Sequence, residues 1–225
     1  MTTAKTPADE AEARAIQDEL RKTVVLDEAG PPPGRGLVAG VDVAYDDERD
    51  LVAAAAVVLD AATLEVVEQA TAVGHVSFPY VPGLLAFREL PTVLAALDSL
   101  NAVPDLVVCD GYGLAHPRGF GLACHLGVVT GLPSMGVAKN PFTFTYEEPG
   151  DRRGDAAPLV AADGAVVGRA LRTQDGIKPV YVSVGHRISL DTACAHALAL
   201  SPRFRIPEST RHADSLCRRA LREAS

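Results

Sequence analysis

Residues 104–140 read PDLVVCDGYGLAHPRGFGLACHLGVVTGLPSMGVAKN, and we expect the other segments of the chain to be organised around this stretch. It opens with the apolar run Leu106–Cys109, which is typical of a buried strand, and Asp110 follows this run directly. A buried, unpaired carboxylate is unfavourable for stability, but the end of a core strand is a rigid position that opens into the crevice above an α/β sheet. No Asp or Glu occurs from Gly111 to Tyr146, although the chain has 29 acidic residues. We therefore predict a functional site beside Asp110.

The length and composition indicate one ordinary globular domain, for which we predict the range 1–225. The chain has 225 residues, of which 48% are hydrophobic and 22% are charged, and this is enough to bury a core. Its apolar runs are much shorter than the roughly 20 residues that span a bilayer, and its acidic N-terminal segment lacks the apolar centre of a signal peptide. Four cysteines without CxxC spacing favour reduced, buried thiols. We expect a cytoplasmic protein without a membrane partner, and a monomer, because no long apolar patch demands a second subunit.

Charge is unevenly distributed along the chain. The net charge of −8 argues, taken alone, against a nucleic-acid partner. Residues 1–168 carry 11 basic and 24 acidic side chains, whereas residues 169–225 carry 10 basic and 5 acidic side chains. This distribution permits a cationic face on an acidic protein. An ordinary solvated surface explains it equally well.

The hydrophobic periodicity predicts a three-layer α/β domain. A helix at 8–24 is followed by strands at 37–45, 51–59 and 63–73, whose connecting turns are so short that the strands should be antiparallel neighbours. Beyond them the pattern predicts helices at 83–100, 118–130, 189–200 and 208–223 and strands at 105–109, 134–138, 158–161, 165–171 and 179–184. Pro91 indicates a kink in the second helix or a later start. We therefore expect a mixed sheet, an antiparallel meander plus parallel strands, with helices on its faces.

Three further acidic residues are candidates to act with Asp110. Asp42 lies in an apolar strand, and it would approach Asp110 if the first and fourth strands pair, because neighbouring strands lie about 4.8 Å apart. Two close carboxylates repel each other, and oxygen ligands without a Cys/His cluster favour Mg²⁺ or Mn²⁺ over Zn²⁺ as the compensating cation. Glu89 and Asp214 are weaker candidates, because a solvated helix position explains Glu89 and the dipole of the last helix explains Asp214.

His116 and Lys139 complete the predicted set. His116 lies in a loop rich in Gly and Pro, where a core role is uncommon. Lys139 ends the apolar run 136–139, where a buried cation would need a partner. A cation at that position is able to hold a phosphate or an attacking water.

Three sequence blocks resemble the endonuclease V family, which nicks nucleic acids at inosine, the deamination product of adenosine. The blocks are GVDVAY at 40–45, PYVPG at 79–83 with FRE at 87–89, and the segment from DG at 110–111 through HPR at 116–118 to GVAK at 136–139. Phe78, Asn140 and the acidic turn 46–50 depart from the usual family pattern, but none of them is a proposed ligand. The resemblance implies an RNase H-like fold, in agreement with the strand order above.

The same resemblance implies a Mg²⁺-dependent DNA-repair endonuclease, a deoxyribonuclease in which Mn²⁺ is able to substitute. It would hydrolyse the second phosphodiester bond 3′ to deoxyinosine and leave 3′-hydroxyl and 5′-phosphate ends. The expected partner is DNA that contains deoxyinosine or other deaminated bases. The family positions that match Asp42, Glu89, Asp110 and, in many members, Asp214 form the carboxylate cluster for the metal. Metal ions in such nucleases act in pairs or alone, and the resemblance leaves both possibilities open.

The segment Pro79-Tyr80-Val81-Pro82 looks like the wedge of the family. Two prolines stiffen the loop, and Tyr80 offers a face that can stack in the gap left by a base rotated into a pocket. The resemblance implies that backbone at Gly83 and Gly111 lines this pocket, with Leu85 nearby, so that amides reach the O6 and N1–H edge of hypoxanthine. His116 and Lys139 match family positions near the site, where they contact the displaced strand or the catalytic water.

Three other functions compete with this prediction. An inosine-specific endoribonuclease would carry the same wedge and would differ in contacts to the ribose 2′-hydroxyl. A non-catalytic inosine-binding module would lack one or more of the acidic residues, and all four are present. A phosphatase for small molecules would have no use for a wedge.

Overall fold

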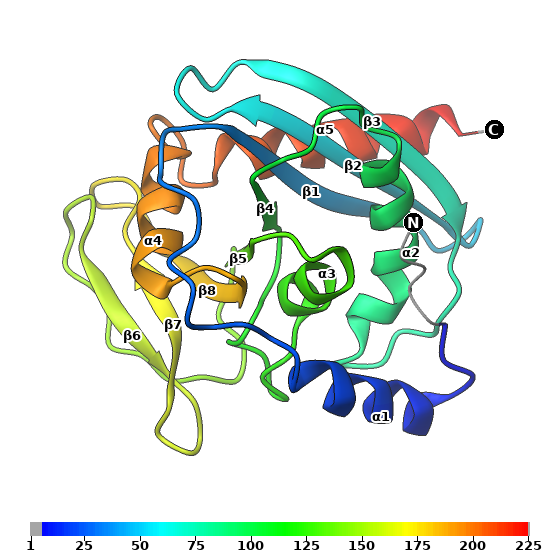
Figure 1. The fold of residues 1–225 in the computed structure, drawn as a ribbon, viewed down its shortest axis with the longest axis horizontal. Helices are drawn as coiled ribbons and strands as arrows, with labels where there is room; N and C mark the ends of the chain where they lie inside the picture. Colours follow the sequence, from blue (N-terminus) through cyan, green and yellow to red (C-terminus); the bar gives the residue numbers. More distant parts are fainter. Residues whose placement is uncertain (1–5, 225) are drawn as a thin grey trace.

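The computed structural model describes residues 6–224, and in this range the chain folds into a single sheet with helices on both faces. Figure 1 shows these elements. The helices are α1 (Glu10–Arg21), α2 (Leu85–Asp98), α3 (Leu122–Thr130), α4 (Leu190–Ala199) and α5 (Glu208–Glu223). The strands are β1 (Leu37–Asp46), β2 (Leu51–Asp60), β3 (Val66–His75), β4 (Leu106–Cys109), β5 (Ser134–Ala138), β6 (Ala156–Val160), β7 (Val166–Leu171) and β8 (Val180–His186).

The eight strands form one mixed sheet in the order β3-β2-β1-β4-β5-β8-β7-β6. β1, β2 and β3 are antiparallel neighbours, as the short turns predict. β4 pairs in parallel with β1 on one side and with β5 on the other, and β8 then returns antiparallel to β5. The predicted α/β class and its mixed central sheet are thus confirmed.

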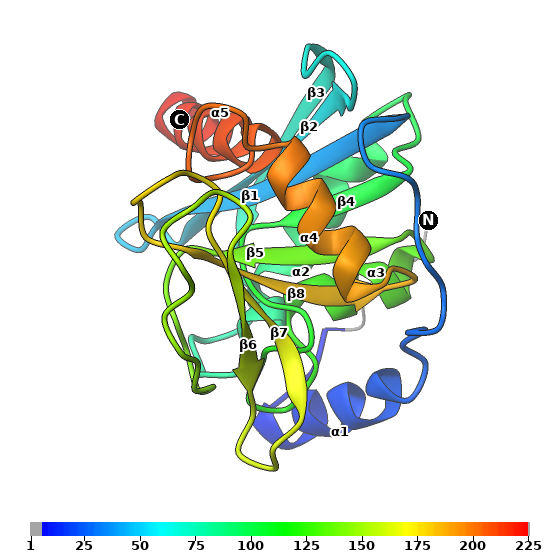
Figure 2. The ribbon, with the colours of Figure 1, turned by 90° about the vertical axis from the view of Figure 1, so that its left-hand side faces the viewer.

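Helices cover both faces of the sheet, which gives the three predicted layers. α2 and α3 pack on one face, where Leu90, Val93 and Leu126 meet the alternate apolar residues of β1, β2 and β4. α5 packs on the opposite face against Ala55, Val57 and other residues of β2, and α4 covers the same face further along the sheet (Figure 2). β2 reads LVAAAAVVLD because both of its faces are buried, so it has no need of alternating polar residues.

The pairing of β1 with β4 sets the geometry of the site. In this parallel pair Val41 is opposite Cys109, and the Asp110 backbone N–H donates to the Val41 carbonyl over 3.3 Å. Asp42 and Asp110 follow these two residues, so the two acidic residues lie side by side at the same level of the sheet. The condition under which Asp42 and Asp110 were expected to converge, pairing of the first and fourth strands, is thus met.

The boundaries of several elements differ from the predicted ones because the preceding turns and loops include more residues than expected. The third strand begins at Val66 rather than at residue 63, since the Asp60 carboxylate accepts from the backbone N–H groups of Ala62 and Thr63 and holds them in a turn. The third helix begins at Leu122 rather than at residue 118, because Gly119 adopts a φ of +62° in the preceding loop. The second helix continues through Pro91 and starts at Leu85, six residues before it.

The N-terminal helix α1 lies against α3 at the edge of the molecule (Figure 1). It is shorter than the predicted helix 8–24 and is capped by the Asp9 side chain, which accepts from the Glu12 backbone N–H over 2.8 Å. Residues 1–5 and 225 of the predicted domain range lie outside the described part of the chain. None of the helices in the described part is long and apolar enough to cross a membrane.

Candidate active site

Asp42, Asp110 and Lys139 meet on three neighbouring strands, two of them at strand ends. Asp110 directly follows β4 and Lys139 directly follows β5, while Asp42 lies in β1 beside them. The Lys139 ammonium group donates a hydrogen bond to Asp110 Oδ2 and lies 4.0 Å from Asp42 Oδ2. One cation therefore compensates two carboxylates whose charges would otherwise repel each other.

Asp42 is the most deeply buried side chain of this group. Its side chain is only 10% exposed, and Oδ1 accepts from the Val43 backbone N–H over 2.8 Å. Its other oxygen, Oδ2, is buried without a hydrogen-bond partner. Burial, followed by the charge of Asp110, raises the pKa of Asp42 to about 8. A buried carboxylate oxygen with an open acceptor position is a feature that a hard cation would satisfy.

Glu89 is buried rather than solvated, so the simple helix-surface interpretation of this residue is wrong. It projects from α2, and its side chain accepts from the Tyr45 hydroxyl over 3.1 Å. Burial raises the pKa of Glu89 to about 7, while the Tyr45 hydrogen bond acts in the opposite direction. Arg88 stacks over the Tyr45 ring at 4.6 Å and pairs with Asp47 at 2.9 Å, and these contacts fix the Tyr45 ring.

Asp214 lies on α5, and its ion-pair partner Arg218 is an exposed residue of the same helix. Its Oδ1 accepts from Arg218 Nε over 3.0 Å, one helical turn along α5. Its charge still raises the pKa of Asp42, after the larger effects of burial and Asp110. Within residues 6–224 no three His, Cys, Asp or Glu side chains are grouped closely enough to hold a metal ion. The four predicted acidic residues thus surround one region without forming a preassembled cage.

The close approach of α5 to β1 depends on Gly40. A Cβ atom at Gly40 would lie 2.2 Å from the Ser209 carbonyl carbon and 2.6 Å from the Thr210 nitrogen. Only a residue without a side chain permits this contact. The glycine of the GVDVAY block is therefore required for the packing that places Asp214 near Asp42.

A cavity of about 260 Å³ opens next to the acidic residues. Its wall includes Asp110 and Glu89 together with the predicted pocket residues Gly83, Gly111 and Leu85. Three residues of the predicted wedge also line it, namely Tyr80, Val81 and Pro82, whereas Pro79 does not. The structure thus brings two separate predictions, the wedge loop and the acidic strand end, into one concave site.

His116 also lines this cavity, and its ring is neutral near pH 7. Burial, and then the charge of Arg118, lower the pKa of His116 to about 4. Its Nδ1 accepts from the Arg118 backbone N–H over 3.2 Å, so the ring proton resides on Nε2. A hydrogen bond with the Gly83 backbone acts in the opposite direction on this pKa, and the Nε2 side of the ring lies at the cavity wall beside Gly83.

The wedge loop presents an aromatic face to solvent. The Tyr80 side chain is 69% exposed, unusually high for an aromatic residue, while Phe78, just before the loop, is buried against Phe87. Gly83 ends the loop with a φ of +82°, a conformation that favours glycine. The loop is thus anchored at its base and exposed at its tip.

Seven cavity residues were not predicted from the sequence: Gln17, Ala86, Tyr112, Phe120, Gly121, Leu122 and Phe142. Tyr112 and Phe142 stack with ring centroids 5.7 Å apart, and the exposed Phe142 forms part of the cavity wall. The only sequence signal for this pair is the presence of aromatic residues inside the acid-free window. A glutamine in an amphipathic helix gives no signal at all, because such residues usually face solvent.

The basic surplus of residues 169–225 serves internal contacts to a large extent. Six of its ten basic side chains are engaged with acidic or backbone partners: Arg169, Arg172, Arg187, Arg205, Arg211 and Arg218. Arg205 donates to the carbonyl groups of Pro179 and Lys139, and so braces the strand end that carries the Lys139 ammonium group. The charge count therefore overstates the cationic face available to a partner.

A mixed sheet with this strand order, helices on both faces and acidic residues side by side on adjacent strands defines an RNase H-like α/β protein. The chain belongs to the endonuclease V family, whose sequence pattern matches residues 18–215. The endonuclease V of Streptomyces avermitilis is 75% identical over 97% of this chain and 95% of its own length. As a member of this family, the protein is an endonuclease, a hydrolase.

Solved structures of relatives agree with this assignment. The crystal structure of the Streptomyces avermitilis protein has a TM-score of 0.96, with 97% of this chain and 96% of that chain covered. The catalytic domain of human endonuclease V is 36% identical, with a TM-score of 0.87 over 95% of this chain and 96% of that chain. Endonuclease V of Ciona intestinalis, 28% identical with a TM-score of 0.84 over 96% and 98% of the two chains, was solved in complex with a 24mer DNA containing an inosine followed by a ribo-adenosine.

Proposed function

We propose that this endonuclease recognises deoxyinosine in DNA and hydrolyses the second phosphodiester bond 3′ to the lesion, leaving 3′-hydroxyl and 5′-phosphate ends. One observation carries the proposal: the wedge loop and Asp110 line the same cavity. In this proposal, a site for reading a base and a site for cleaving the backbone would be adjacent. The inosine-containing DNA bound by the Ciona intestinalis relative supports the choice of lesion.

The cavity is the proposed receptor for the displaced base. Its volume of about 260 Å³ lies near the lower end of ligand-sized pockets, about 300–1,000 Å³, and suits one base rather than a longer segment. Tyr80, exposed at the rim, would stack where the base has left the helix. Backbone groups at Gly83 and Gly111 would meet the hypoxanthine edge, because glycine lets polar backbone atoms approach closely.

The acidic residues fit a divalent cation, and we propose Mg²⁺, with Mn²⁺ as a substitute. The buried Asp42 Oδ2 lacks a partner, and the donors are all hard oxygen atoms, which Mg²⁺ prefers. Asp42 and Asp110 would hold the ion, with Glu89 and Asp214 as additional ligands directly or through water. When bound, Mg²⁺ would supply charge neutralisation at the phosphate and activation of water.

The remaining polar residues would hold and orient the substrate. Lys139 lies at the strand ends with its ammonium group on Asp110, so it is placed to contact a phosphate oxygen or the attacking water. His116 is neutral and carries its proton on Nε2, so it would act as a hydrogen-bond donor at the cavity rather than as a general base. Arg205 would keep the Lys139 backbone in place.

A second candidate function is cleavage of inosine-containing RNA. The substrate of the Ciona intestinalis relative places a ribonucleotide directly after the inosine, and this favours a site that accepts a 2′-hydroxyl there. In this candidate the same residues would act on a ribonucleotide strand. The monomeric state and the cytoplasmic location stay predictions.

A cleavage assay on matched single-stranded oligonucleotides tests the proposal. The substrates carry deoxyinosine in DNA, inosine in RNA, or the corresponding adenine, and each is incubated with Mg²⁺ or with EDTA. We expect one cut, one nucleotide beyond the lesion, that requires Mg²⁺ and is lost in Asp110→Ala. Tyr80→Ala should lower kcat/KM for deoxyinosine about tenfold, because stacking on an aromatic face contributes about 1–3 kcal/mol per base.

The outcomes separate the competing functions. Faster cleavage of the RNA substrate would favour the endoribonuclease. Tight binding of inosine without cleavage under either metal would indicate a binding module. Equal cleavage of inosine and adenine would refute lesion recognition, and hydrolysis of small phosphate esters alone would indicate a phosphatase.

A further inference from the structure

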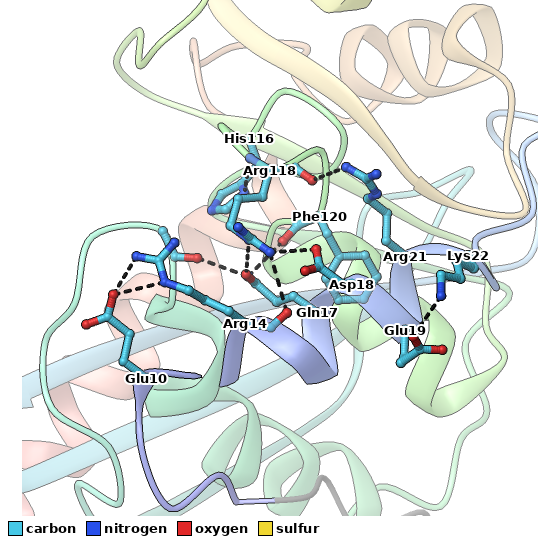
Figure 3. Close-up of polar contacts among 11 residues, drawn as sticks. Glu10, Arg14, Gln17, Asp18, Glu19, Arg21, Lys22, His116, Arg118 and Phe120 are labelled. Carbon is cyan, nitrogen blue, oxygen red and sulfur yellow. Dashed lines mark hydrogen bonds and ion pairs between the residues drawn. The ribbon is translucent and has the colours of Figure 1, made fainter. Parts of the chain in front are cut away.

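Gln17 is a buried polar residue that contacts two separate parts of the cavity wall. It projects from α1 and is only 1% exposed. Its Nε2 donates to the Gly83 carbonyl over 2.9 Å and to the Phe120 carbonyl over 3.3 Å. Both acceptors belong to cavity residues, and Gln17 itself lines the cavity. Figure 3 shows Gln17 between α1 and the loop that carries Phe120 and Arg118.

Arg118 determines the orientation of this amide. Its Nε donates to Gln17 Oε1 over 2.9 Å, and its guanidinium also pairs with Asp18 at 2.5 Å (Figure 3). Arginine has donors and no acceptor, so the oxygen of Gln17 must face Arg118. The amide nitrogen must then face the two carbonyl groups. All of the hydrogen-bonding groups of this buried amide are used, and its orientation is unambiguous.

The two peptide groups that Gln17 contacts are each held at one end by a local hydrogen bond. The Gly83 carbonyl shares its peptide with the Leu84 N–H, which donates to the Val81 carbonyl over 2.9 Å. The Phe120 carbonyl shares its peptide with the Gly121 N–H, which donates to the Gly113 carbonyl over 3.0 Å. Gln17 holds the opposite end of both peptides. Without it, the Phe120 peptide would keep one anchor, while Gly83 would keep the Leu84 N–H contact and its backbone hydrogen bond with His116. Both glycine-flanked segments would then be freer to move.

The composition of α1 agrees with a polar bracing role. Its buried residues are Ala13 and Gln17, one turn apart, and the larger Ile16 is only partly buried. A helix retained for core packing alone would direct larger apolar side chains inward. Additional polar contacts join α1 to the same loop, since Arg21 donates to the Arg118 carbonyl over 3.0 Å.

We propose that Gln17, oriented by Arg118, is a positioning residue that fixes the Gly83 and Phe120 peptide groups and thereby sets the discrimination between hypoxanthine and adenine. The inference rests on the proposed function, because it assumes that the cavity receives the base. Gln17 would act on the base by fixing the position of the wall segments at Gly83 and Phe120, whose peptide groups it holds. Its loss should therefore affect the affinity for the correct base more than the affinity for an incorrect one.

Equilibrium binding measures this discrimination separately from catalysis. Fluorescence anisotropy in EDTA gives Kd for two single-stranded oligonucleotides that differ only in deoxyinosine or adenine. The quantity compared, called the Kd ratio, is the Kd for the adenine oligonucleotide divided by the Kd for the deoxyinosine oligonucleotide. A larger Kd ratio means stronger discrimination. Partial unfolding of a variant lowers the binding-competent fraction for both oligonucleotides equally and leaves this ratio unchanged. A thermal melt of each variant records stability independently.

Two substitutions separate the contacts of Gln17. Gln17→Met fills a similar volume without hydrogen bonds, and we expect it to lower the Kd ratio about tenfold, mainly through weaker binding of deoxyinosine. Gln17→Glu still accepts from Arg118 but has no N–H for the carbonyl groups, so it should lose discrimination to the same extent. Arg118→Lys, at a partly exposed side chain, should lower the ratio about threefold by loosening the amide. Glu10→Gln, an exposed residue of the same helix, is the matched control and should leave the ratio unchanged.

Each outcome has one interpretation. If the wild-type protein binds both oligonucleotides equally, the proposed function fails. If the wild type discriminates and both Gln17 variants discriminate equally well, only the positioning role is refuted. If Gln17→Glu retains the wild-type ratio while Gln17→Met loses it, the carbonyl contacts are not responsible and the proposal is overturned. If both Gln17 variants fail to fold, the Kd ratio of Arg118→Lys decides. A ratio below that of the wild type supports the positioning role, and an unchanged ratio refutes it.

Discussion

At the scale of single residues, Asp42 combines a proposed role in cation binding with a cost to the fold. Its Oδ2 is buried without a partner, and burial together with Asp110 raises its pKa to about 8. We expect Asp42→Asn to abolish cleavage, with a loss of at least about 10³-fold. The same change should raise the free energy of unfolding in EDTA at pH 8 by about 1–2 kcal/mol, because it removes a poorly compensated buried charge.

Urea denaturation in EDTA and a cleavage assay in Mg²⁺ measure the two effects of Asp42→Asn. A variant that loses both stability and activity would show that Asp42 is a structural residue. Asp46→Asn, at the exposed end of the same strand, is a suitable comparison, because Arg49 hydrogen-bonds that carboxylate.

Tyr45 holds the carboxylate of Glu89, and this contact leads to a pH-dependent prediction. The hydroxyl of Tyr45 donates to Glu89 Oε1 and thereby lowers a pKa that burial raises to about 7. Tyr45→Phe removes that hydrogen bond, so the pKa of Glu89 should rise further. If the ionised carboxylate is the active form, the acidic limb of the pH profile of kcat/KM should shift to higher pH.

A series of cleavage rates from pH 6 to 9 measures the Tyr45→Phe effect, for which we also expect about a tenfold loss of rate at pH 7. Tyr146→Phe is the matched control, because its hydroxyl bonds to Tyr181 away from the acidic residues. An unchanged profile in Tyr45→Phe would exclude Glu89 ionisation as the origin of the acidic limb.

At the scale of secondary-structure elements, Gly40 controls how closely α5 approaches β1. A Cβ atom there would lie 2.2 Å from the backbone of Ser209, and a backbone atom cannot move aside as a flexible side chain can. We expect Gly40→Ala to lower the free energy of unfolding by about 1–3 kcal/mol. The cleavage rate should fall by more than the loss of folded protein explains, because displacement of α5 also displaces Asp214.

Chemical denaturation and cleavage rates together test the Gly40→Ala prediction. Gly74→Ala is the control, since a Cβ atom at this strand position would meet only the Thr92 hydroxyl at 3.7 Å. Equal stability of the two variants would mean that α5 shifts at little cost.

At the scale of the whole molecule, His116 and His125 each contribute to a loss of stability in acid. Burial lowers the pKa of His125 to about 4, and burial followed by the Arg118 charge does the same for His116. The unfolded chain, with an ordinary histidine pKa near 6.5, binds more protons than the folded chain between about pH 6.5 and 4. The contribution of each of these histidines to stability should therefore fall as the pH decreases through this window, by up to about 1.4 kcal/mol per pH unit.

His125→Gln isolates one of these contributions. His125 is 2% exposed and lies between the rings of Phe87 and Phe120. The variant should lose stability less steeply than the wild type between pH 6.5 and 4, as measured by denaturation at several pH values. Asp42 and Glu89, whose pKa values are raised, act in the opposite direction in both proteins, so the difference between the two curves isolates His125. His75→Gln, at the exposed end of β3, should leave the slope unchanged.

Local patterns in the sequence were sufficient to predict the element order and most of the acidic site. Short turns force antiparallel neighbours, an apolar run with a terminal acid marks a strand end, and Asp42 and Asp110 are conspicuous because acids are rare in such runs. The predicted starts at residues 63 and 118 were wrong, because the Asp60 side chain and the Gly119 conformation extend the preceding loops. Glu89 was underestimated, since helical periodicity does not reveal which polar residue is buried.

The sequence by itself determined the mixed α/β sheet, the two carboxylates at neighbouring strands and the stiff loop at residues 79–82, because each follows from local chemistry. Only the tertiary structure decided that Lys139 bridges the two carboxylates, that Tyr45 holds Glu89, and that Asp214 pairs with Arg218. It alone showed Gln17 joining α1 to Gly83 and Phe120, residues 66 and 103 positions away. Contacts of this kind depend on how elements pack in space, and the free energy of burying one polar side chain depends on partners that no local pattern contains.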